Sequence, residues 1–523
     1  MSMAASILYP PRPLPLQLPK ICTALAGPDA AHILELAESI VREDPFLEFR
    51  LDSLKQPLAA LPRFRQFSQR YPHAVLIATC RRAANGGSFR GSVAAQMEVL
   101  AKASGAGFHI VDLELQTART LSQPVLDKIR SRSALLLSYH DFRGTRKLQS
   151  TLDLMRTIPA DYYKLVSTAN CLYDNVVMMK FLEEQSRESS LIGFCLGTQG
   201  IISRVLAVRA GSIFTFAAVG PGAETAPGQL AARELREVFR LGHVDAATRL
   251  YGVAGDPVAH SLSPMMMNAA FRRENVNAVY LPLHTKAIDD LLACVRDIPI
   301  AGLSITMPYK EEIVAHLDNM DPITQRSAAC NTVVRANDGR LYGFNTDVAG
   351  LIAALEPRLT LAGCKALVIG AGGAGRAAVF GLKERGAEVF IMNRTPAKAQ
   401  QLARQAKAKC LNRSKVKAHQ FDVIVNATPL GMESAETPLN EKEIRARFVL
   451  DLVYSRGETP FTKAARTAGA EVIPGVEVFV HQGARQFEIW SSKPAPAPEM
   501  LNVVNAALAA QTHTNQGGRN GRK

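Results

Sequence analysis

Short apolar runs alternate with amphipathic stretches throughout the first 240 residues of the chain. The amphipathic stretches have the spacing of helices, as in Val93–Ala103 and Val176–Glu184, and the apolar runs have the length of buried strands. The eight apolar runs are Ile21–Leu25, Phe46–Leu51, Ala74–Cys80, Phe108–Leu115, Ala134–Tyr139, Asp161–Thr168, Leu191–Leu196 and Ile213–Val219. Eight strand–helix repeats in about 250 residues are typical of a (β/α)8 barrel. The pattern therefore predicts an α/β fold with a barrel over residues 20–240.

A second pattern begins at Tyr251 with a strand, a Ser-rich turn and a helix, and strands and helices then alternate to about residue 320. Further on, the strand from Lys365 ends in the loop Gly370-Ala-Gly-Gly-Ala-Gly375, which a helix (Arg376–Arg385) and a strand (Ala387–Met392) follow. This order predicts a Rossmann domain. The expected pyrophosphate contacts are Gly370, Gly372, Gly373, Ala374 and Gly375. A glycine-rich turn with a purely structural role is the alternative.

The end of the second strand in this region distinguishes between cofactors. An NAD site would place an acidic residue there to bind the ribose hydroxyls. This chain instead has Asn393-Arg394-Thr395, with Lys398 one turn later. A guanidinium and an ammonium suit a 2′-phosphate, so the sequence favours NADP. Solvated residues at a helix start are the alternative reading.

Lys164 lies inside an apolar strand, where desolvation would lower the pKa of its amine and make it nucleophilic. The preceding strand ends in His140-Asp141. Parallel neighbouring strands would bring this amine and imidazole to one end of the sheet, where barrel active sites lie. The polar residues at the expected strand ends are Glu48, Arg50, Arg81, Glu114, His140 and Lys164. A lysine whose ammonium only reaches the barrel rim is the alternative.

Length and composition limit the classes of protein and partner. A chain of 523 residues is too long for one core, so we expect two or three domains. The net charge of +14 favours anionic partners, but the basic residues are dispersed, which argues against nucleic acid. Eight cysteines without a Cys-x-x-Cys pair fit a reducing cytoplasm, with a plastid left open. No apolar run reaches the roughly 18 residues of a membrane helix, so no membrane partner is expected.

The ends of the chain and the middle have compositions typical of irregular segments. Residues 1–19 are rich in Pro and lack an apolar signal core, which predicts a disordered arm. Residues 511–523 are polar and predict a disordered tail. Arg240–Arg249 is interpreted as the linker between the two halves.

Both halves contain motifs of known families. Residues 20–240 resemble type I 3-dehydroquinate dehydratase, and residues 250–510 resemble shikimate dehydrogenase. The order is that of the bifunctional plant family. The dehydratase motifs are Glu48-Phe-Arg50-Leu-Asp52, Ser138-Tyr-His140-Asp141, Ile202-Ser-Arg204 and Ala226-Pro-Gly-Gln229. The dehydrogenase motifs are His260-Ser261-Leu-Ser263-Pro264, Ser304-Ile-Thr306-Met-Pro308-Tyr-Lys310, Gly343-Phe-Asn345-Thr346-Asp347 and Asn426-Ala-Thr-Pro-Leu-Gly431.

In the first half, the resemblance implies that Lys164 forms an imine with the substrate ketone and that His140 transfers protons. The residues implied to bind the substrate are Glu48, Arg50, Arg81, Arg204, Thr225 and Gln229, with Thr225 at a place usually held by Ser. One position departs from the family. The family has Thr-x-Arg-x-x-x-Glu-Gly-Gly, whereas this chain has Asn85 before Gly86-Gly87. The effect of losing this carboxylate on the dehydratase rate is left open.

In the second half, the resemblance implies a catalytic Lys310 with Asp347 as its partner. The implied substrate contacts are Ser261, Ser263, Thr306, Asn331, Tyr454 and Gln482, and the further cofactor contacts are Arg376, Thr428 and Gly475. It also implies a shikimate-binding domain over residues 250–350 and a Rossmann NADP-binding domain over 351–490. A C-terminal helical segment over 491–510 would return to the substrate domain.

The resulting hypothesis is a bifunctional enzyme that dehydrates 3-dehydroquinate to 3-dehydroshikimate and then reduces this product to shikimate with NADPH. No metal is implied, because His140 has no second ligand at a zinc-like spacing. A non-catalytic regulator is the main alternative, but it predicts loss of Lys164, His140, Lys310 and Asp347, which all remain. A preference for quinate and a weak dehydratase half stay open, as do the oligomeric state and transfer of the intermediate between sites.

Overall fold

The computed structural model describes residues 14–15, 17–259, 261–432, 434–453 and 457–517, with side chains up to Ala510. The chain divides into two compact units, Met1–Ala247 and Thr248–Lys523. Within the described ranges, no helix has the length and apolar character needed to cross a membrane. The same ranges contain no group of three or more His, Cys, Asp or Glu side chains arranged to hold a metal ion.

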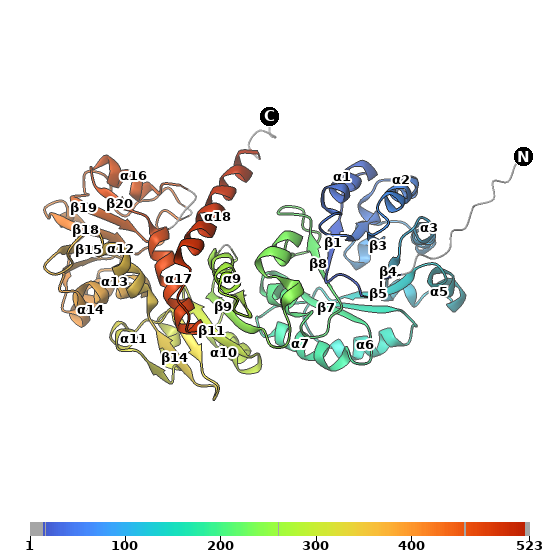
Figure 1. Ribbon diagram of the computed structural model, residues 1–523, viewed down its shortest axis with the longest axis horizontal. Helices are drawn as coiled ribbons and strands as arrows, with labels where there is room; N and C mark the ends of the chain where they lie inside the picture. The colour runs from blue at the N-terminus through green and yellow to red at the C-terminus, as the bar shows by residue number, and fades with distance from the viewer. Residues whose placement is uncertain (1–13, 16, 260, 433, 454–456, 518–523) are drawn as a thin grey trace, which may run out of the picture. The chain divides into compact units, whose positions relative to one another are not determined.

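The first unit is an eight-stranded parallel sheet surrounded by helices (Figure 1). Its strands are β1 (Ile21–Leu25), β2 (Phe46–Arg50), β3 (Val75–Thr79), β4 (Ile110–Glu114), β5 (Ala134–His140), β6 (Tyr162–Thr168), β7 (Leu191–Leu196) and β8 (Thr215–Ala218). The strand order is β7-β6-β5-β4-β3-β2-β1-β8. Ile213, just before β8, donates to the carbonyl of Leu191 in β7 at 2.9 Å, so the sheet nearly closes. The predicted barrel is confirmed, and each predicted run contains one strand, except that β5 extends one residue past its run to His140.

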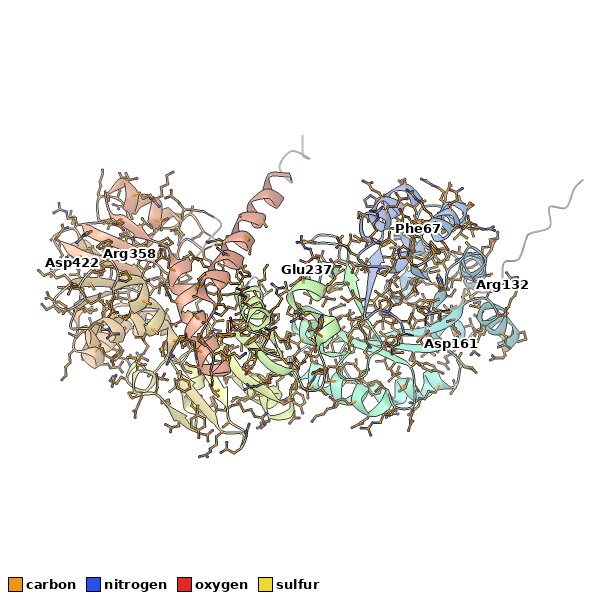
Figure 2. All side chains as sticks on the ribbon, in the orientation of Figure 1. Phe67, Arg132, Asp161, Glu237, Arg358 and Asp422 are labelled. Carbon is orange, nitrogen blue, oxygen red and sulfur yellow. The ribbon has the colours of Figure 1, made fainter. Side chains whose placement is uncertain are left out.

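Helices cover the outside of this barrel. They are α1 (Ala30–Ile40), α2 (Pro57–Arg70), α3 (Val93–Gly105), α4 (Leu115–Ala118), α5 (Gln123–Arg130), α6 (Leu148–Arg156), α7 (Asp174–Gln185) and α8 (Ile201–Leu206), with the short helical turns η1 (Leu51–Ser53), η2 (Ala83–Asn85), η3 (Thr198–Gly200), η4 (Glu234–Val238) and η5 (Leu241–His243). Asp29 caps α1 by accepting from His32 N at 3.0 Å. Phe67 of α2 packs on Phe49 of β2 with ring centroids 5.7 Å apart (Figure 2).

The barrel interior changes from apolar to polar along the strands. Successive strand side chains point to opposite faces, so residues two apart share a face. Phe46 and Ile110 belong to one buried apolar cluster in the barrel. Two residues further along the same strands, the buried residues are Glu48 and Asp112. Strand periodicity thus places acidic groups above an apolar floor, toward the carboxyl ends of the strands.

Most of the predicted disordered arm and residues 518–523 of the predicted tail lie outside the described residues, so the described residues bear only on the inner ends of these two segments. Leu18 is 8% exposed and Leu14 packs against the apolar barrel cluster, so the ordered chain begins before residue 20. Both leucines thus bury apolar surface against the barrel strands. At the other end, helix α18 (Ala497–Gly517) continues past Gln511. The alanine-rich turn before Gln511 favours a helix, which polar residues can extend at little cost.

The second unit begins with a mixed sheet in the order β10-β9-β11-β13-β14-β12. Its strands are β9 (Arg249–Gly255), β10 (Ala278–His284), β11 (Ile300–Ile305), β12 (Asn319–Met320), β13 (Thr332–Arg335) and β14 (Leu341–Phe344). Its helices are α9 (Ser263–Arg273), α10 (Ile288–Asp297), η6 (Glu312–His316), α11 (Pro322–Ser327) and α12 (Thr346–Leu355). Because β9 and β11 are parallel neighbours, the loops after them leave the sheet at one edge.

A parallel sheet follows in the order β17-β16-β15-β18-β19-β20. Its strands are β15 (Lys365–Ile369), β16 (Glu388–Met392), β17 (Lys409–Cys410), β18 (Phe421–Asn426), β19 (Ala446–Asp451) and β20 (Glu471–Ile473), and its helices are α13 (Gly373–Glu384), α14 (Pro396–Ala406), α15 (Arg413–Val416), α16 (Pro460–Thr467) and α17 (Gly475–Ser491). The order reverses between β15 and β18, the point where Rossmann domains bind nucleotides. The Rossmann prediction is confirmed, although α13 begins at Gly373 rather than at Arg376.

Helix α17 connects the parts of the second unit. It packs along α12, and α18 packs against α9. The approach to α12 is close, since a Cβ on Gly350 would lie 2.8 Å from the carbonyl oxygen of Val478. Arg358, after α12, donates to Glu477 of α17 at 3.0 Å (Figure 2). Together these contacts hold α12 against α17.

Candidate active sites

Lys164 lies inside the barrel on β6 and is 3% exposed. Its Nζ donates to Asp112 Oδ2 at 3.2 Å and lies 3.9 Å from Glu48 Oε1. The same nitrogen lies 3.7 Å from the centre of the Phe216 ring. Burial lowers the pKa of Lys164, and the charges of Asp112 and Glu48 oppose this shift. A buried amine with a lowered pKa has a larger neutral, nucleophilic fraction than a surface lysine.

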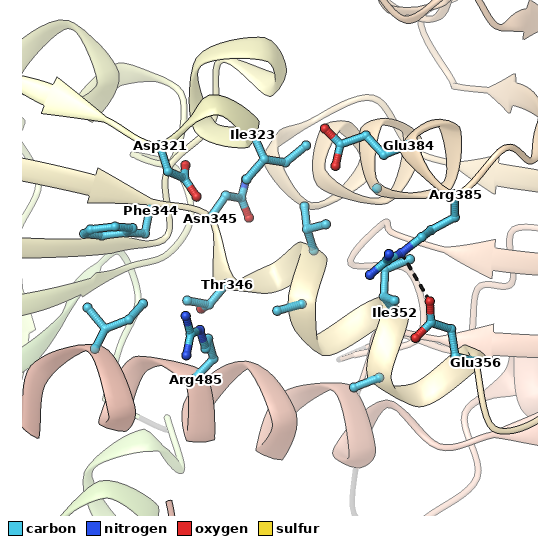
Figure 3. Close-up of a pocket in the computed structure, with 15 residues that line it drawn as sticks. Asp321, Ile323, Phe344, Asn345, Thr346, Ile352, Glu356, Glu384, Arg385 and Arg485 are labelled. Carbon is cyan, nitrogen blue, oxygen red and sulfur yellow. Dashed lines mark ion pairs between the residues drawn. The ribbon is translucent and has the colours of Figure 1, made fainter. Parts of the chain in front are cut away.

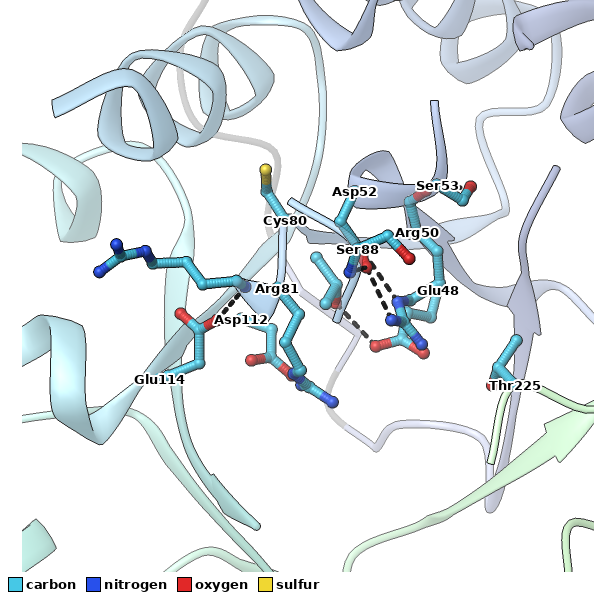
Figure 4. A network of polar contacts seen from close by, with 12 residues as sticks. Glu48, Arg50, Asp52, Ser53, Cys80, Arg81, Ser88, Asp112, Glu114 and Thr225 are labelled. Atoms are coloured by element: carbon cyan, nitrogen blue, oxygen red, sulfur yellow. Dashed lines mark hydrogen bonds and ion pairs between the residues drawn. The ribbon is translucent and has the colours of Figure 1, made fainter. Parts of the chain in front are cut away.

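Asp112 links this lysine to His140. Arg81 Nη2 donates to Asp112 Oδ2 at 2.8 Å (Figure 4). Arg81 Nη1 donates to His140 Nε2 at 3.0 Å. Ser138 Oγ donates to the other oxygen of Asp112 at 2.6 Å. Burial opposes ionisation of Asp112, but the positive charges of Arg81 and Lys164 lower its pKa to about 2. The carboxylate is therefore a fixed negative charge that contacts Lys164 directly and is connected to His140 through Arg81.

His140 is held in its neutral form. Burial, followed by the positive charges of Arg81, Lys164 and Arg50, lowers its pKa well below the ordinary value of 6.5. An arginine can only donate, so Nε2 of His140 accepts and the ring proton lies on Nδ1. A neutral imidazole near pH 7 can act as a general base.

Arg50 and Glu48 occupy the end of β2, next to this network. Arg50 pairs with Asp52 through two hydrogen bonds of 2.9 and 2.8 Å, and Asp52 also accepts from Ser88 N at 3.0 Å (Figure 4). Glu48 accepts from Thr79 Oγ1 at 2.7 Å. Arg50 is thereby held at the barrel mouth by a carboxylate from its own strand end.

Arg204 is a buried cation without a carboxylate partner among the described residues. It is 1% exposed, and its guanidinium donates to the carbonyl of Pro227 at 3.1 Å. Burial lowers its pKa to about 10, so the group stays charged at neutral pH. The loop after β8 also brings Thr225 and Gln229 together, because Gln229 Oε1 accepts from Thr225 N at 2.7 Å. An uncompensated buried guanidinium is suited to an anionic ligand.

Asn85 lies in turn η2, and no hydrogen bond joins it to His140 in the described network. The next residue, Gly86, has a φ of +79°, and a Cβ there would lie 2.4 Å from the Phe142 ring. That ring is stacked near the His140 imidazole, with centroids 6.1 Å apart. The turn thus contacts the imidazole environment through Phe142. Arg81, rather than a carboxylate, is the polar partner of His140.

In the second unit, Lys310 and Asp347 form a pair. Lys310 Nζ donates to Asp347 Oδ2 at 2.5 Å, with side chains 17% and 18% exposed. Asn331 Nδ2 donates to the other oxygen of Asp347 at 2.8 Å and to Gln482 Oε1 at 3.3 Å. Two predicted substrate contacts, Asn331 and Gln482, therefore meet the predicted catalytic pair in one network. An ammonium with a carboxylate partner in a partly open site can transfer a proton.

A second, buried polar network supports Asn331. Gln486, one turn after Gln482, donates to the carbonyl of Asn331 at 3.1 Å and accepts from Ser304 Oγ at 2.8 Å. Tyr280 donates to Ser304 Oγ at 2.5 Å. These buried side chains satisfy one another, so they fix the end of β11 relative to α17.

The other predicted substrate residues lie on loops at the same sheet edge. Ser263 begins α9, and its backbone N–H donates to Ser261 Oγ at 3.2 Å. Thr306 follows β11, one turn before Lys310, and its carbonyl accepts from Tyr309 N at 3.0 Å. The loops after β9 and β11 thus supply hydroxyls near the Lys310 segment. Tyr454 lies outside the described residues.

The glycine loop after β15 has the shape of a nucleotide cradle. Gly370 has a φ of +117°, and a Cβ on Gly375 would lie 2.3 Å from the carbonyl oxygen of Gly370. A Cβ on Gly372, which caps α13, would contact nothing within 4 Å. Gly375 is therefore required for tight packing within the loop, whereas the space next to Gly372 at the start of α13 is open, as a pyrophosphate needs. Ala374 lies in the first turn of α13.

The remaining cofactor candidates lie around this loop. Asn393 follows β16 and donates to the carbonyl of Thr395 at 3.0 Å, while Arg394 and Lys398 are exposed beside it. Thr428 follows β18 and donates to Asn426 Oδ1 at 2.7 Å. Both segments leave the sheet at its carboxyl edge, on either side of β15.

Two of these cofactor candidates also have contacts within the protein. Arg376 is 8% exposed and donates to the carbonyl of Ser327 and to Gln405 Oε1, the latter at 2.9 Å. Its assignment as a cofactor contact stays a prediction. Gly475 begins α17, where a Cβ would lie 2.3 Å from the carbonyl oxygen of Asp451. Close packing of the helix start explains the glycine at this position.

Sequence reasoning missed Asp112 and Gln486. Asp112 is an acidic residue inside the apolar run Phe108–Leu115, just as Lys164 is a basic residue inside an apolar strand, so the same pattern could have identified it. Gln486 follows Gln482 by four residues, so both lie on one face of a helix. That spacing could have identified the supporting network, but not its partners on β10 and β11.

Comparisons with known proteins divide the chain in the same places. Residues 21–246 match the profile of type I 3-dehydroquinase. Residues 253–333 match the shikimate dehydrogenase substrate binding domain. Residues 353–454 match shikimate / quinate 5-dehydrogenase, and residues 475–504 match the shikimate 5′-dehydrogenase C-terminal domain.

Relatives match one or both halves. The chain is 32% identical over 474 residues to the chloroplastic bifunctional 3-dehydroquinate dehydratase/shikimate dehydrogenase of Arabidopsis thaliana, covering 86% of this chain and 78% of that protein. It is 38% identical over 281 residues to shikimate dehydrogenase (NADP(+)) of Anaeromyxobacter dehalogenans, covering 51% and 100%. A crystal structure of shikimate 5-dehydrogenase from Thermus thermophilus in complex with NADP(H) and shikimate is 35% identical, covers 50% of this chain and all of that one, and has a TM-score of 0.47.

Proposed function

The chain belongs to the family of bifunctional 3-dehydroquinate dehydratases/shikimate dehydrogenases, and from this premise we propose how each half performs its reaction. The barrel is a type I 3-dehydroquinase and the second unit is an NADP-dependent shikimate dehydrogenase. The observation that best supports the mechanism is the continuous network from Lys164 through Asp112 and Arg81 to His140.

In the barrel, the neutral amine of Lys164 attacks the ketone of 3-dehydroquinate, and water leaves as the imine forms. The iminium withdraws electrons, so the proton on the neighbouring carbon becomes acidic enough for neutral His140 to remove. The β-hydroxyl then leaves as water, assisted by the protonated imidazole. Water hydrolyses the iminium, which frees Lys164 and releases 3-dehydroshikimate. Overall, one water is lost from the substrate.

Three charged groups are suited to hold the substrate during these steps. Arg204 is a buried cation without a carboxylate partner in the described part of the chain, so it supplies the charge for the substrate carboxylate. Arg50, fixed by Asp52, and Glu48, fixed by Thr79, are placed to bind hydroxyls. Thr225 and Gln229 belong to the loop whose Pro227 carbonyl contacts Arg204, so we place them beside it in the substrate site.

In the second unit, Lys310 and Asp347 transfer the proton of the hydroxyl that forms or is lost at the reacting carbon. Asn331, Gln482 and the hydroxyls of Ser261, Ser263 and Thr306 orient the substrate. The bound dinucleotide supplies a hydride. The residues that would hold it are the Gly370–Gly375 loop, Asn393, Arg394, Thr395, Lys398 and Thr428, and the open space above Gly372 fits its pyrophosphate.

A two-step assay on the purified chain tests this function. With 3-dehydroquinate alone, absorbance of the conjugated enone should rise; on adding NADPH, absorbance at the NADPH band should fall as shikimate forms. Loss of NADPH with 3-dehydroshikimate but no enone from 3-dehydroquinate would restrict the activity to the second unit. Quinate with NADP+ in the same assay measures the open preference between quinate and shikimate.

We also propose domain boundaries close to the division at Ala247 and Thr248. The barrel domain would cover residues 20–240, the substrate domain 250–350, the nucleotide domain 351–490 and the returning helical segment 491–510. Expressed separately, residues 1–247 and 248–523 should each catalyse one step. Insolubility of both fragments would contradict independent domains. The compartment stays a prediction: cysteine usage favours the cytoplasm, whereas the Arabidopsis relative is chloroplastic by name.

A further inference from the structure

The turn Ser327–Asn331, between α11 and β13, contacts both functional parts of the second unit. Ala328 has a φ of +46°, in the left-handed region that residues with a Cβ seldom adopt. Cys330 N donates to the carbonyl of Lys310 at 2.8 Å, and Asn345 Nδ2 donates to that of Ala329 at 2.8 Å. The conformation of the turn is therefore maintained by the segments that carry Lys310 and Asp347.

The turn ends at Asn331, which determines the position of Asp347. Asn331 Oδ1 accepts from Thr346 N at 2.7 Å, and its Nδ2 donates to Asp347 Oδ1 at 2.8 Å. Asp347 in turn accepts from Lys310 Nζ at 2.5 Å. A shift of the turn would therefore move the carboxylate, its lysine partner and a substrate amide together.

Arg376 contacts the other end of this turn from the nucleotide domain. It lies in the first turn of α13, directly after the glycine cradle, and donates through Nε to the carbonyl of Ser327. Gln405 of α14 accepts from its Nη2 at 2.9 Å and holds the guanidinium in place. No carboxylate among the described residues lies within ion-pair distance of it. A buried cation is costly, and here its partners are two neutral acceptors, the Ser327 carbonyl and Gln405 Oε1, so the contact positions the turn rather than neutralising a charge.

The carboxyl end of α13, away from Arg376, borders a cavity. A cavity of about 450 Å³ lies between α11, α12, α13 and α17 (Figure 3). Its lining includes Ile323 of α11, Asn345 and Thr346 at the start of α12, and Glu384 of α13. An ion pair between Arg326 and Glu384 also joins α11 to α13, and it is exposed. The buried hydrogen bond from Arg376 to Ser327 is a second connection between α13 and the turn.

We propose that Arg376 is a positioning residue that couples dinucleotide binding at the Gly370–Gly375 loop to the geometry of Asn331 and Asp347. A dinucleotide that orders the start of α13 also fixes Arg376, which then fixes the turn and the substrate site. Reciprocity requires that shikimate strengthen dinucleotide binding by the same factor. This inference rests on the proposed dehydrogenase function of the second unit.

The test measures binding of shikimate by calorimetry, with and without saturating NADPH. Both ligands are then reduced, so no hydride transfer occurs and binding is read without turnover. In the unaltered chain, NADPH should tighten shikimate binding by about fivefold or more. Arg376→Met should bring this ratio close to one. Arg376→Lys, which keeps a donor of shorter reach, should restore part of it.

Two further variants separate positioning from folding and from surface charge. Gln405→Leu alters an exposed residue, keeps Arg376, and should lower the ratio of shikimate affinities with and without NADPH. This variant tests the coupling even if Arg376→Met does not fold. Arg326→Gln removes the exposed link between the same helices and should keep the ratio. An unchanged ratio in folded Arg376→Met and Gln405→Leu would overturn the proposal, as would a ratio of one in the unaltered chain. Weaker NADPH binding by Arg376→Met with the ratio preserved would instead make Arg376 a cofactor contact. If the unaltered chain bound neither ligand, the proposed function itself would fail.

Discussion

Each half of the chain places a lysine beside a carboxylate, but the two pairs lie in different surroundings. Lys164 and Asp112 are 3% and 1% exposed as side chains, and their nearest atoms are 3.2 Å apart. Lys310 and Asp347 are 17% and 18% exposed and 2.5 Å apart. The barrel lysine also faces the Phe216 ring, whereas the dehydrogenase lysine faces the first residue of α13, where a Cβ on Gly373 would lie 2.8 Å from the Lys310 Cβ.

The same pair of residue types is therefore suited to two chemistries. Burial makes the neutral form of Lys164 accessible, and Asp112 is shared with Arg81 rather than reserved for the lysine. Such an amine can form a covalent bond. Lys310 is partly hydrated and has a short, direct hydrogen bond to its carboxylate, an arrangement suited to proton transfer. Burial and the number of partners, rather than residue type, distinguish a nucleophile from an acid.

The largest expected effect separates these roles at Lys164. Lys164→Ala and Lys164→Arg should both lower dehydratase kcat by more than about a thousandfold, because neither side chain can form an imine. Borohydride added with 3-dehydroquinate should attach the substrate to Lys164 in the unaltered chain, as peptide mass spectrometry would detect. NADPH-dependent reduction of 3-dehydroshikimate should remain in both variants. Adduct formation on another lysine would refute the assignment.

Removing the proton donor Lys310 should lower dehydrogenase activity strongly without abolishing it. Lys310→Met and Asp347→Asn should lower dehydrogenase kcat by about 100-fold to 10,000-fold, the usual contribution of a general acid. Dehydratase activity of the same preparations serves as the control for concentration. Borohydride should trap no substrate on Lys310. A covalent adduct on Lys310 would contradict the distinction between a nucleophilic Lys164 and a proton-transferring Lys310.

The sequence predicted the elements well because strand and helix periods are local properties. All eight barrel strands and the strand–loop–helix order around Gly370 followed from such patterns. Lys164 and His140 were found because a charged or polar residue in an apolar strand is conspicuous. The contact of Arg376 with the turn could not be predicted from the sequence. Its position after the glycine loop indicates only that it lies near a cofactor, whereas its side chain donates to Ser327, 49 residues earlier. Contacts of that kind are set by tertiary packing alone.

A smaller effect concerns the cofactor. Arg394 is exposed at the end of β16, where an acidic residue would bind NAD. A charged hydrogen bond to a 2′-phosphate contributes about 1.5–3 kcal/mol, so NADP should be preferred over NAD by at least about tenfold. Arg394→Ala should lose most of this preference by raising KM for NADPH and not for NADH. Arg404→Ala is the matched control, because Arg404 is an exposed arginine in the last turn of α14, whereas Arg394 lies just before its first turn. Equal kcat/KM with both cofactors in the unaltered chain would contradict the prediction.

The smallest expected effect concerns Asn85 and the charge balance that makes the barrel site unlike the dehydrogenase site. The dehydratase base must be neutral, so its rate falls as pH drops through the pKa of His140. Burial and three neighbouring cations lower that pKa well below 6.5, so the acid limb of the kcat/KM profile should lie below that value. A carboxylate near the imidazole favours the protonated ring and raises its pKa. Asn85→Glu should therefore move the acid limb upward by about one pH unit or less, since the turn reaches His140 only through Phe142.

Asn85→Gln separates charge from shape in this experiment, because it lengthens the side chain as Glu does without adding a charge. Its acid limb should stay with that of the unaltered chain, and the dehydrogenase profile should be the same in all three proteins. If Asn85→Glu and Asn85→Gln shift the limb equally, the turn acts through packing against Phe142. If neither shifts it, Asn85 serves only the turn before Gly86, whose φ of +79° already demands a flexible residue there. A shift with Glu alone would mean that the cations around His140, which no carboxylate of this turn offsets, set the working pH of the barrel.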